Sequence, residues 1–162
     1  MAALEALALA YVGRYATTRA RLADYLRRKL RDRGWDGPDE PPVASVVSRL
    51  AELKYVDDAA FAEVRGAALT RRGYGARRVS QALAGAGVDE EDSANARTMV
   101  EAHAIDAAMA FARRRRIGPF ATVALDREQR RKAFAAMLRA GHAPAVARRI
   151  TDALPGADIE DD

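Results

Sequence analysis

Three glycines at nearly equal spacing constrain the fold of this chain more than any other feature. Gly34, Gly87 and Gly141 each follow a stretch with helical periodicity, and they lie 53 and 54 residues apart. Glycine commonly ends a helix because it adopts positive φ without steric cost. A large apolar residue stands four positions before each glycine: Leu30, Leu83 and Met137. This pattern predicts three units of similar length, each containing a helix that ends at a glycine.

Apolar side chains recur at helical spacing along the whole chain. Leu4, Leu7, Ala8 and Tyr11, for example, follow the i, i+3, i+4, i+7 rule of one helical face. Apolar residues make up 49% of the chain and aromatic residues only 6%, which favours close-packed helices over a sheet. We expect nine helices. Their inward-facing residues, among them Val64 and Met99, fall within the segments Leu4–Tyr15, Leu22–Leu30, Val43–Leu53, Phe61–Leu69, Val79–Leu83, Ala96–His103, Ile105–Phe111, Ala133–Leu138 and Val146–Leu154.

These observations together predict an all-α fold. The chain divides into three tandem three-helix repeats at about 1–55, 56–104 and 105–155, followed by an acidic C-terminal tail at 156–162. Each repeat would contain a first helix, an elbow, a second helix ended by glycine and a third helix. Because such small units bury little apolar surface alone, we expect them to stack into an elongated, curved solenoid with a shared core.

The charged residues follow the same period. Arginines gather at the elbows between first and second helices, whereas acids gather between second and third helices, so a stacked array would have one basic edge and one acidic edge. The net charge is +4, and arginine binds phosphate and carboxylate equally well, so the charge fits nucleic acid or an acidic protein partner. The elbow cations are Arg14, Arg19, Arg21, Arg71, Arg72, Arg77, Arg78, Arg113–Arg116, Arg127, Arg130 and Arg131, and the acids are Asp32, Asp36, Asp39, Glu40 and Asp89–Asp92.

No pattern in the sequence indicates catalysis or a metal site. Without cysteine there is neither a disulfide nor a thiolate ligand. His103 and His142 fall in different predicted repeats, with no serine nucleophile or second metal ligand beside them. The run Gly73–Gly75 lacks the Gly-Lys-Ser/Thr of a phosphate-binding loop and is read as an elbow. No apolar run approaches the roughly 20 residues that span a bilayer, so we predict a cytoplasmic protein. Together with the missing catalytic and metal-binding patterns, this predicts a non-enzymatic protein without cofactor or metal.

Two segments near the middle of the chain are similar to the signature of a known family. Leu53–Ala62 (LKYVDDAAFA) followed by Arg71–Val79 (RRGYGARRV) resembles the central signature of RecX, a family of small regulators of the RecA recombinase. The first-repeat pattern of that family is matched by Arg19-Ala20-Arg21-Leu22 with Leu26, Lys29-Leu30 and Gly34. The resemblance covers nearly the whole chain and is strongest up to Val88. Two departures are Ala76, where many relatives have proline, and the long connection Asp36–Pro42.

The resemblance implies a function as well as a fold. It implies one elongated, monomeric RecX-like domain over 1–162 that lodges in the groove of the RecA nucleoprotein filament, suppresses its ATPase and strand exchange, and can promote its disassembly. Such a protein would act in homologous recombination, DNA repair and the SOS response. An independent helical DNA-binding module is the alternative. The expected filament contacts are Arg19, Arg21, Arg71, Arg72, Tyr74, Arg77, Arg78, Arg113, Arg114, Arg115 and Arg116.

Several of these residues also have simpler interpretations. Arg113–Arg116 fits a solvated helix C-terminus, where cations are favoured, as well as it fits a filament contact. Tyr74 fits core packing slightly better than stacking on a base or a partner side chain. The acidic residues Asp158–Asp162 fit a solubilising end better than a DNA mimic.

Overall fold

The computed structural model describes residues 2–37 and 39–159, and every regular element in them is a helix. This confirms the predicted all-α fold. Residues 160–162 of the predicted acidic tail lie outside the described residues. The elements are α1 (Ala2–Val12), α2 (Arg19–Arg33), α3 (Val43–Glu52), α4 (Asp58–Arg71), α5 (Ala76–Ala84), α6 (Glu90–Ala102), α7 (Ala104–Arg115), the 3-10 helix η1 (Gly118–Phe120), α8 (Arg127–Arg139) and α9 (Pro144–Asp152).

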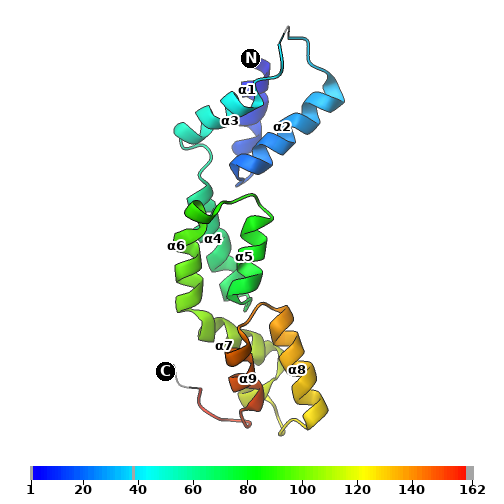
Figure 1. Ribbon diagram of the computed structural model, residues 1–162, viewed down its shortest axis with the longest axis vertical. Helices are drawn as coiled ribbons and strands as arrows, with labels where there is room; N and C mark the ends of the chain where they lie inside the picture. Colours follow the sequence, from blue (N-terminus) through cyan, green and yellow to red (C-terminus); the bar gives the residue numbers. More distant parts are fainter. Residues whose placement is uncertain (1, 38, 160–162) are drawn as a thin grey trace.

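The helices form three consecutive groups along the long axis of the molecule (Figure 1), namely α1–α3, α4–α6, and α7–α9 with η1. Each group encloses its own cluster of buried apolar side chains, which contains Leu26 in the first group, Leu83 in the second and Ile150 in the third. We expected one shared core, but these clusters are separate. Tyr74, which is half-buried, packs against both the second and the third cluster. The stacking of the groups therefore depends on local contacts where they meet.

Side-chain caps begin α2, α4, α6 and α8. Thr18 caps α2, and its hydroxyl also donates a hydrogen bond to the carbonyl of Ala86 in the second group. Asp126 and Gln129 form a capping box at the start of α8, in which each side chain accepts from the other residue's backbone N–H. Asp57 and Asp89 cap α4 and α6 in the simpler one-bond form.

The glycine turns after α5 and α8 each dock on the first turn of a helix in the preceding group. Gly87 (φ 76°) lies against Ala20 of α2, where an added Cβ would be 2.3 Å from the Cβ of Ala20. Gly141 (φ 94°) lies against Arg78 of α5, where an added Cβ would be 2.4 Å from the Arg78 amide nitrogen. Both turns need glycine for conformation and for space. Gly34 also has positive φ (80°), but nothing lies within 4 Å of a Cβ built there.

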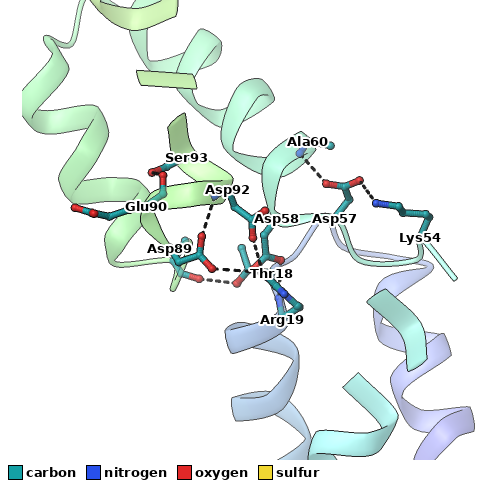
Figure 2. A network of polar contacts seen from close by, with 11 residues as sticks. Thr18, Arg19, Lys54, Asp57, Asp58, Ala60, Asp89, Glu90, Asp92 and Ser93 are labelled. Carbon is teal, nitrogen blue, oxygen red and sulfur yellow. Dashed lines mark hydrogen bonds and ion pairs between the residues drawn. The ribbon is translucent and has the colours of Figure 1, made fainter. Parts of the chain in front are cut away.

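We call the contact of Gly87 with α2 the first junction, and a polar network centred on Arg19 closes it (Figure 2). The backbone N–H of Arg19 donates to Asp58 Oδ1 at 2.9 Å, and its Nε donates to Oδ2 at 3.3 Å. A terminal nitrogen of Arg19 also contacts Asp92, and it lies 3.7 Å from Asp89. The hydrogen bond to Asp58 raises the pKa of Arg19 above its ordinary value. One arginine thus joins three carboxylates of the second group.

Five apolar residues predicted to face inward are exposed instead. Tyr15, Leu53 and Leu154 follow the last residues of α1, α3 and α9, so the helical face no longer sets their direction. Val64 and Met99 lie within α4 and α6, on faces that no other described element buries. Periodicity locates the apolar side of a helix, but it does not show how much of that side a neighbour covers.

The separation of the three groups predicts an elongated particle in solution. A compact chain of this length would have a radius of gyration of about 15 Å. We expect small-angle X-ray scattering to give a clearly larger radius and a distance distribution with a long tail. A value near the compact one would contradict the arrangement in Figure 1.

The buried carboxylate at the first junction should contribute more to stability than an exposed one. We expect Asp58→Asn to lower the free energy of unfolding by about 1–3 kcal/mol, because the buried side chain that accepts the hydrogen bonds of Arg19 loses its negative charge. Asp24→Asn is the matched control, since Asp24 forms only an exposed ion pair with Arg27 and should cost at most about 0.5 kcal/mol. Urea denaturation measures both; equal losses would show that the Arg19 network is not a stabilising contact.

Candidate functional site

The contact of Gly141 with α5, which we call the second junction, is made largely by backbone atoms. The Gly75 N–H donates to the carbonyl of Ala140 at 2.9 Å, and the Arg77 N–H donates to the carbonyl of Gly141 at 3.2 Å. These bonds satisfy amides at the start of α5 that the helix itself leaves free. The backbone of Arg77 and Arg78 is therefore fixed against the third group, while both side chains remain exposed.

A buried histidine adds a side-chain contact to the second junction. His142 is 5% exposed, and its Nε2 lies 3.0 Å from the carbonyl of Gly73, to which it can donate. The ring of Phe111 packs beside it, with the centroids 5.6 Å apart. Burial lowers the pKa of His142 below its ordinary value, although the bond to Gly73 opposes the shift. The imidazole is thus neutral near pH 7 and holds the elbow between α4 and α5 against α7.

The elbow arginines around this junction point in different directions. Arg71 lines a depression between α4 and α6, whereas Arg77 lines a groove of about 200 Å³ shared with Arg139 of α8. The guanidinium of Arg72 lies over the ring of Tyr74, 5.8 Å from its centroid. The half-buried position of Tyr74 between two core clusters supports the packing interpretation of that residue.

The run Arg113–Arg116 does not form one surface, because consecutive residues of a helix point about 100° apart. Arg113 stacks over Phe120 at 4.9 Å, and Arg115 lies 5.6 Å from the ring centroid of Phe111. Arg114 alone reaches the elbow, where it donates to the carbonyl of Arg72. Arg116 ends α7 in the left-handed conformation, with φ 53°.

The cations of the second junction have no carboxylate partner within the described chain. Among residues 2–37 and 39–159, no ion pair involves Arg71, Arg72, Arg77, Arg78 or any residue of Arg113–Arg116. The sequence itself has no Asp or Glu over 64–88 or over 107–125. The positive potential of these arginines is therefore available to anionic groups of another molecule, such as phosphates or carboxylates.

Arg19 and Arg21 lie elsewhere, at the first junction. Arg19 is held by Asp58, Asp89 and Asp92, so it positions α2 against the second group. Arg21 lies over the ring of Phe61, 5.6 Å from its centroid. The predicted contact set is thus divided between the two junctions.

Sequence reasoning missed two parts of this site. Arg139 was not singled out, although it lies two residues before the glycine turn that docks on α5. The sequence also gives no partner for His142, because that partner is a backbone carbonyl. One signal in the sequence could have identified His142. It directly follows Gly141, and the glycine period marks a contact point.

The arrangement offers charge and shape rather than reactive groups. No cluster of three or more His, Cys, Asp or Glu residues that could hold a metal ion occurs in the described parts of the chain. No described helix is both long and apolar enough to cross a membrane. What the second junction can do chemically is bind anions through guanidinium groups set on a fixed backbone.

Comparisons with known proteins point to one group of relatives. No protein-family model matches the chain. The chain is 34% identical over 161 residues to the regulatory protein RecX of Myxococcus xanthus, which covers 94% of this chain and 86% of that protein. It is 32% identical over 127 residues to the regulatory protein RecX of Agrobacterium fabrum, covering 76% of this chain and 68% of the relative.

Two solved structures share the fold. The crystal structure of RecX from Lactobacillus salivarius aligns with a TM-score of 0.67 at 17% sequence identity and covers 92% of each chain. A second crystal structure, of a regulatory protein RecX, aligns with a TM-score of 0.66 at 23% identity and covers 93% of this chain and 71% of the other.

The buried histidine predicts that acid weakens the fold. Because the pKa of His142 is lowered in the folded state, the unfolded chain binds the proton first as the pH falls below about 6.5. Stability should therefore be full above that pH and decrease below it. We expect the urea midpoint to fall between pH 7.5 and 5.5, and His142→Gln to reduce this difference. The exposed His103 is the control, and a pH dependence removed by His103→Gln instead would exclude His142 as its source.

Proposed function

This chain belongs to the RecX family of regulatory proteins, and we propose that it binds the RecA nucleoprotein filament and lowers the rates of its ATP hydrolysis and strand exchange. The binding surface is centred on the second junction and includes Arg72, Arg77, Arg78 and Arg114. In this proposal the protein acts as a monomer and performs no chemistry of its own. Its effect comes from occupying the filament.

One observation carries the proposal: at the second junction Arg77 and Arg78 have a fixed backbone and no ion pair within the described chain. The Arg77 amide bonds to the Gly141 carbonyl, and Gly141 packs so closely on Arg78 that an added Cβ would lie 2.4 Å from the Arg78 amide nitrogen. Their side chains extend into solvent without an ion pair. A backbone ordered before binding lowers the entropy cost of association, so such cations are suited to a partner contact.

A filament of protein on DNA offers both kinds of anion that these arginines bind. Its phosphates and its acidic side chains both accept charge-assisted hydrogen bonds from guanidinium groups. The three groups extend in one direction (Figure 1), so the chain can follow a groove and contact more than one RecA subunit.

Contact with neighbouring subunits gives a physical route to inhibition. A ligand shifts a conformational equilibrium only by its difference in affinity for the two states. A chain that fits one spacing of RecA subunits better than another would hold the filament at that spacing. ATP hydrolysis and strand exchange would then slow, because both need the subunits to change their arrangement.

A second candidate function is binding to DNA alone. The basic third group favours it, since residues 104–152 contain 11 Lys and Arg but only 4 Asp and Glu. Recognition of phosphates alone weakens steeply with salt, by close to one power of the salt concentration for each phosphate contacted. Binding to bare DNA and to the RecA filament, each measured over a range of salt, distinguishes the two functions, because protein contacts make the second less salt-dependent.

The proposal predicts the effect of reversing the junction charges. We expect Arg77→Glu with Arg78→Glu to weaken filament binding by about 100-fold or more, which is about 3 kcal/mol, because charge-assisted bonds are replaced by repulsion. Inhibition of the RecA ATPase on single-stranded DNA should be lost in parallel. Helicity should remain, since glutamate suits the first turn of α5. Filament affinity, ATPase rate and circular dichroism are measured on the same preparation.

The matched control carries the same reversal on another helix. Arg148 and Arg149 are also adjacent and exposed, but they lie on α9. Reversing them should weaken binding much less. Equal losses for the two pairs, or a folded Arg77/Arg78 variant that inhibits RecA like the parent, would contradict the assignment of the second junction.

A further inference from the structure

A groove of about 630 Å³ lies where the first and second groups meet, and the proposed function does not use it. Helix α4 contributes Ala60, Val64 and Ala68 to its lining, which lie four residues apart on one helical face. Val12 and Tyr15 come from the end of α1 and the turn after it. The groove is within the size range of specific ligand sites in proteins.

The lining exposes large apolar side chains to water. The exposed fraction is 71% for Val64, 58% for Tyr55 and 57% for Tyr15, and all three line the groove. Burial of apolar surface is favourable by about 25 cal/mol per Å². Apolar residues that gather in one exposed groove mark an interaction site more often than scattered ones do.

The rim of this groove is positively charged. Among the described residues, Arg21, Lys54 and Arg65 line it, and Asp57 is the only carboxylate there. The Asp57 carboxylate is already engaged, because it accepts from the Ala60 N–H at 3.0 Å and from Lys54 Nζ at 3.4 Å (Figure 2). Arg21 and Arg65 have no ion pair within residues 2–37 and 39–159. A ligand that matches this rim carries negative charge.

One buried polar group in the lining is also unsatisfied. Thr17 is 7% exposed and lines the groove, and its Oγ1 has no hydrogen-bond partner in the described chain. A buried hydroxyl without a partner costs about 1–3 kcal/mol. Because that oxygen is itself buried, a peptide in the groove would bond to it only if the Thr17 side chain turned toward the groove.

We propose that the groove binds a short acidic peptide segment of a partner protein, with apolar side chains against Val64 and Tyr15 and carboxylates at Arg21 and Arg65. The α4 face from Ala60 to Ala68 is about 12 Å long, which matches roughly two turns of a bound helix. Single-stranded nucleic acid fits less well. Tyr15 and Tyr55 offer rings for base stacking, but the α4 face of Ala60, Val64 and Ala68 offers none, and Arg21 already lies over the ring of Phe61.

Fluorescence anisotropy with a labelled acidic peptide tests this proposal. The probe has about twelve residues, with leucine or phenylalanine at every third or fourth position and glutamate at the others. We expect saturable binding to the full chain and at least tenfold weaker binding to Val64→Glu. The control is Val123→Glu, because Val123 is equally exposed (68%) but lies outside the groove. Both variants should keep their helicity by circular dichroism.

The other outcomes would overturn the proposal. No saturable binding up to about 1 mM peptide, or equal binding by Val64→Glu, would show that the groove is not a peptide site. An oligothymidylate that binds more tightly than the peptide, and loses affinity in Val64→Glu, would assign it to nucleic acid. Sedimentation that shows a dimer in the parent and a monomer in Val64→Glu would assign it to self-association.

Discussion

The packing of a glycine turn against the first turn of a helix is the contact on which this structure depends. At both junctions a glycine, Gly87 or Gly141, packs closely against a helix of the preceding group. A side chain at that position would collide with the helix. The core clusters stabilise each three-helix group, and Tyr74 is the side chain that packs against two of them. The order and direction of the groups along the long axis therefore follow from a contact that almost any substitution at these glycines would block.

The two junctions share this packing but differ in charge. At the first, Asp58, Asp89 and Asp92 surround Arg19, so the cation is used within the molecule. At the second, the acids are absent and the arginines at the start of α5 remain available. The proposed binding surface is thus the one whose internal counter-charges are missing. Arginines in the first turn of a second helix join two groups at the first junction, whereas at the second junction they remain exposed.

The sequence predicts the elements of this fold better than their contacts. Local patterns decide where helices begin and end, so the sequence correctly predicts the glycine turn after each second helix. Exposure of Val64 depends on which neighbour covers α4, and no local pattern contains that information. For the same reason the ion pairs of Arg19 cannot be predicted from the sequence. Its three carboxylates lie 39 to 73 residues away in the chain.

The turn at Gly34 has the positive φ of the docking turns, although nothing in the described chain lies within 4 Å of a Cβ built there. Space therefore sets no limit on the residue at this turn, and only the backbone conformation favours glycine. A substitution at Gly34 should for that reason cost less than the same substitution at Gly87 or Gly141, so tolerance to sequence change is greatest at the glycine turn that joins no groups.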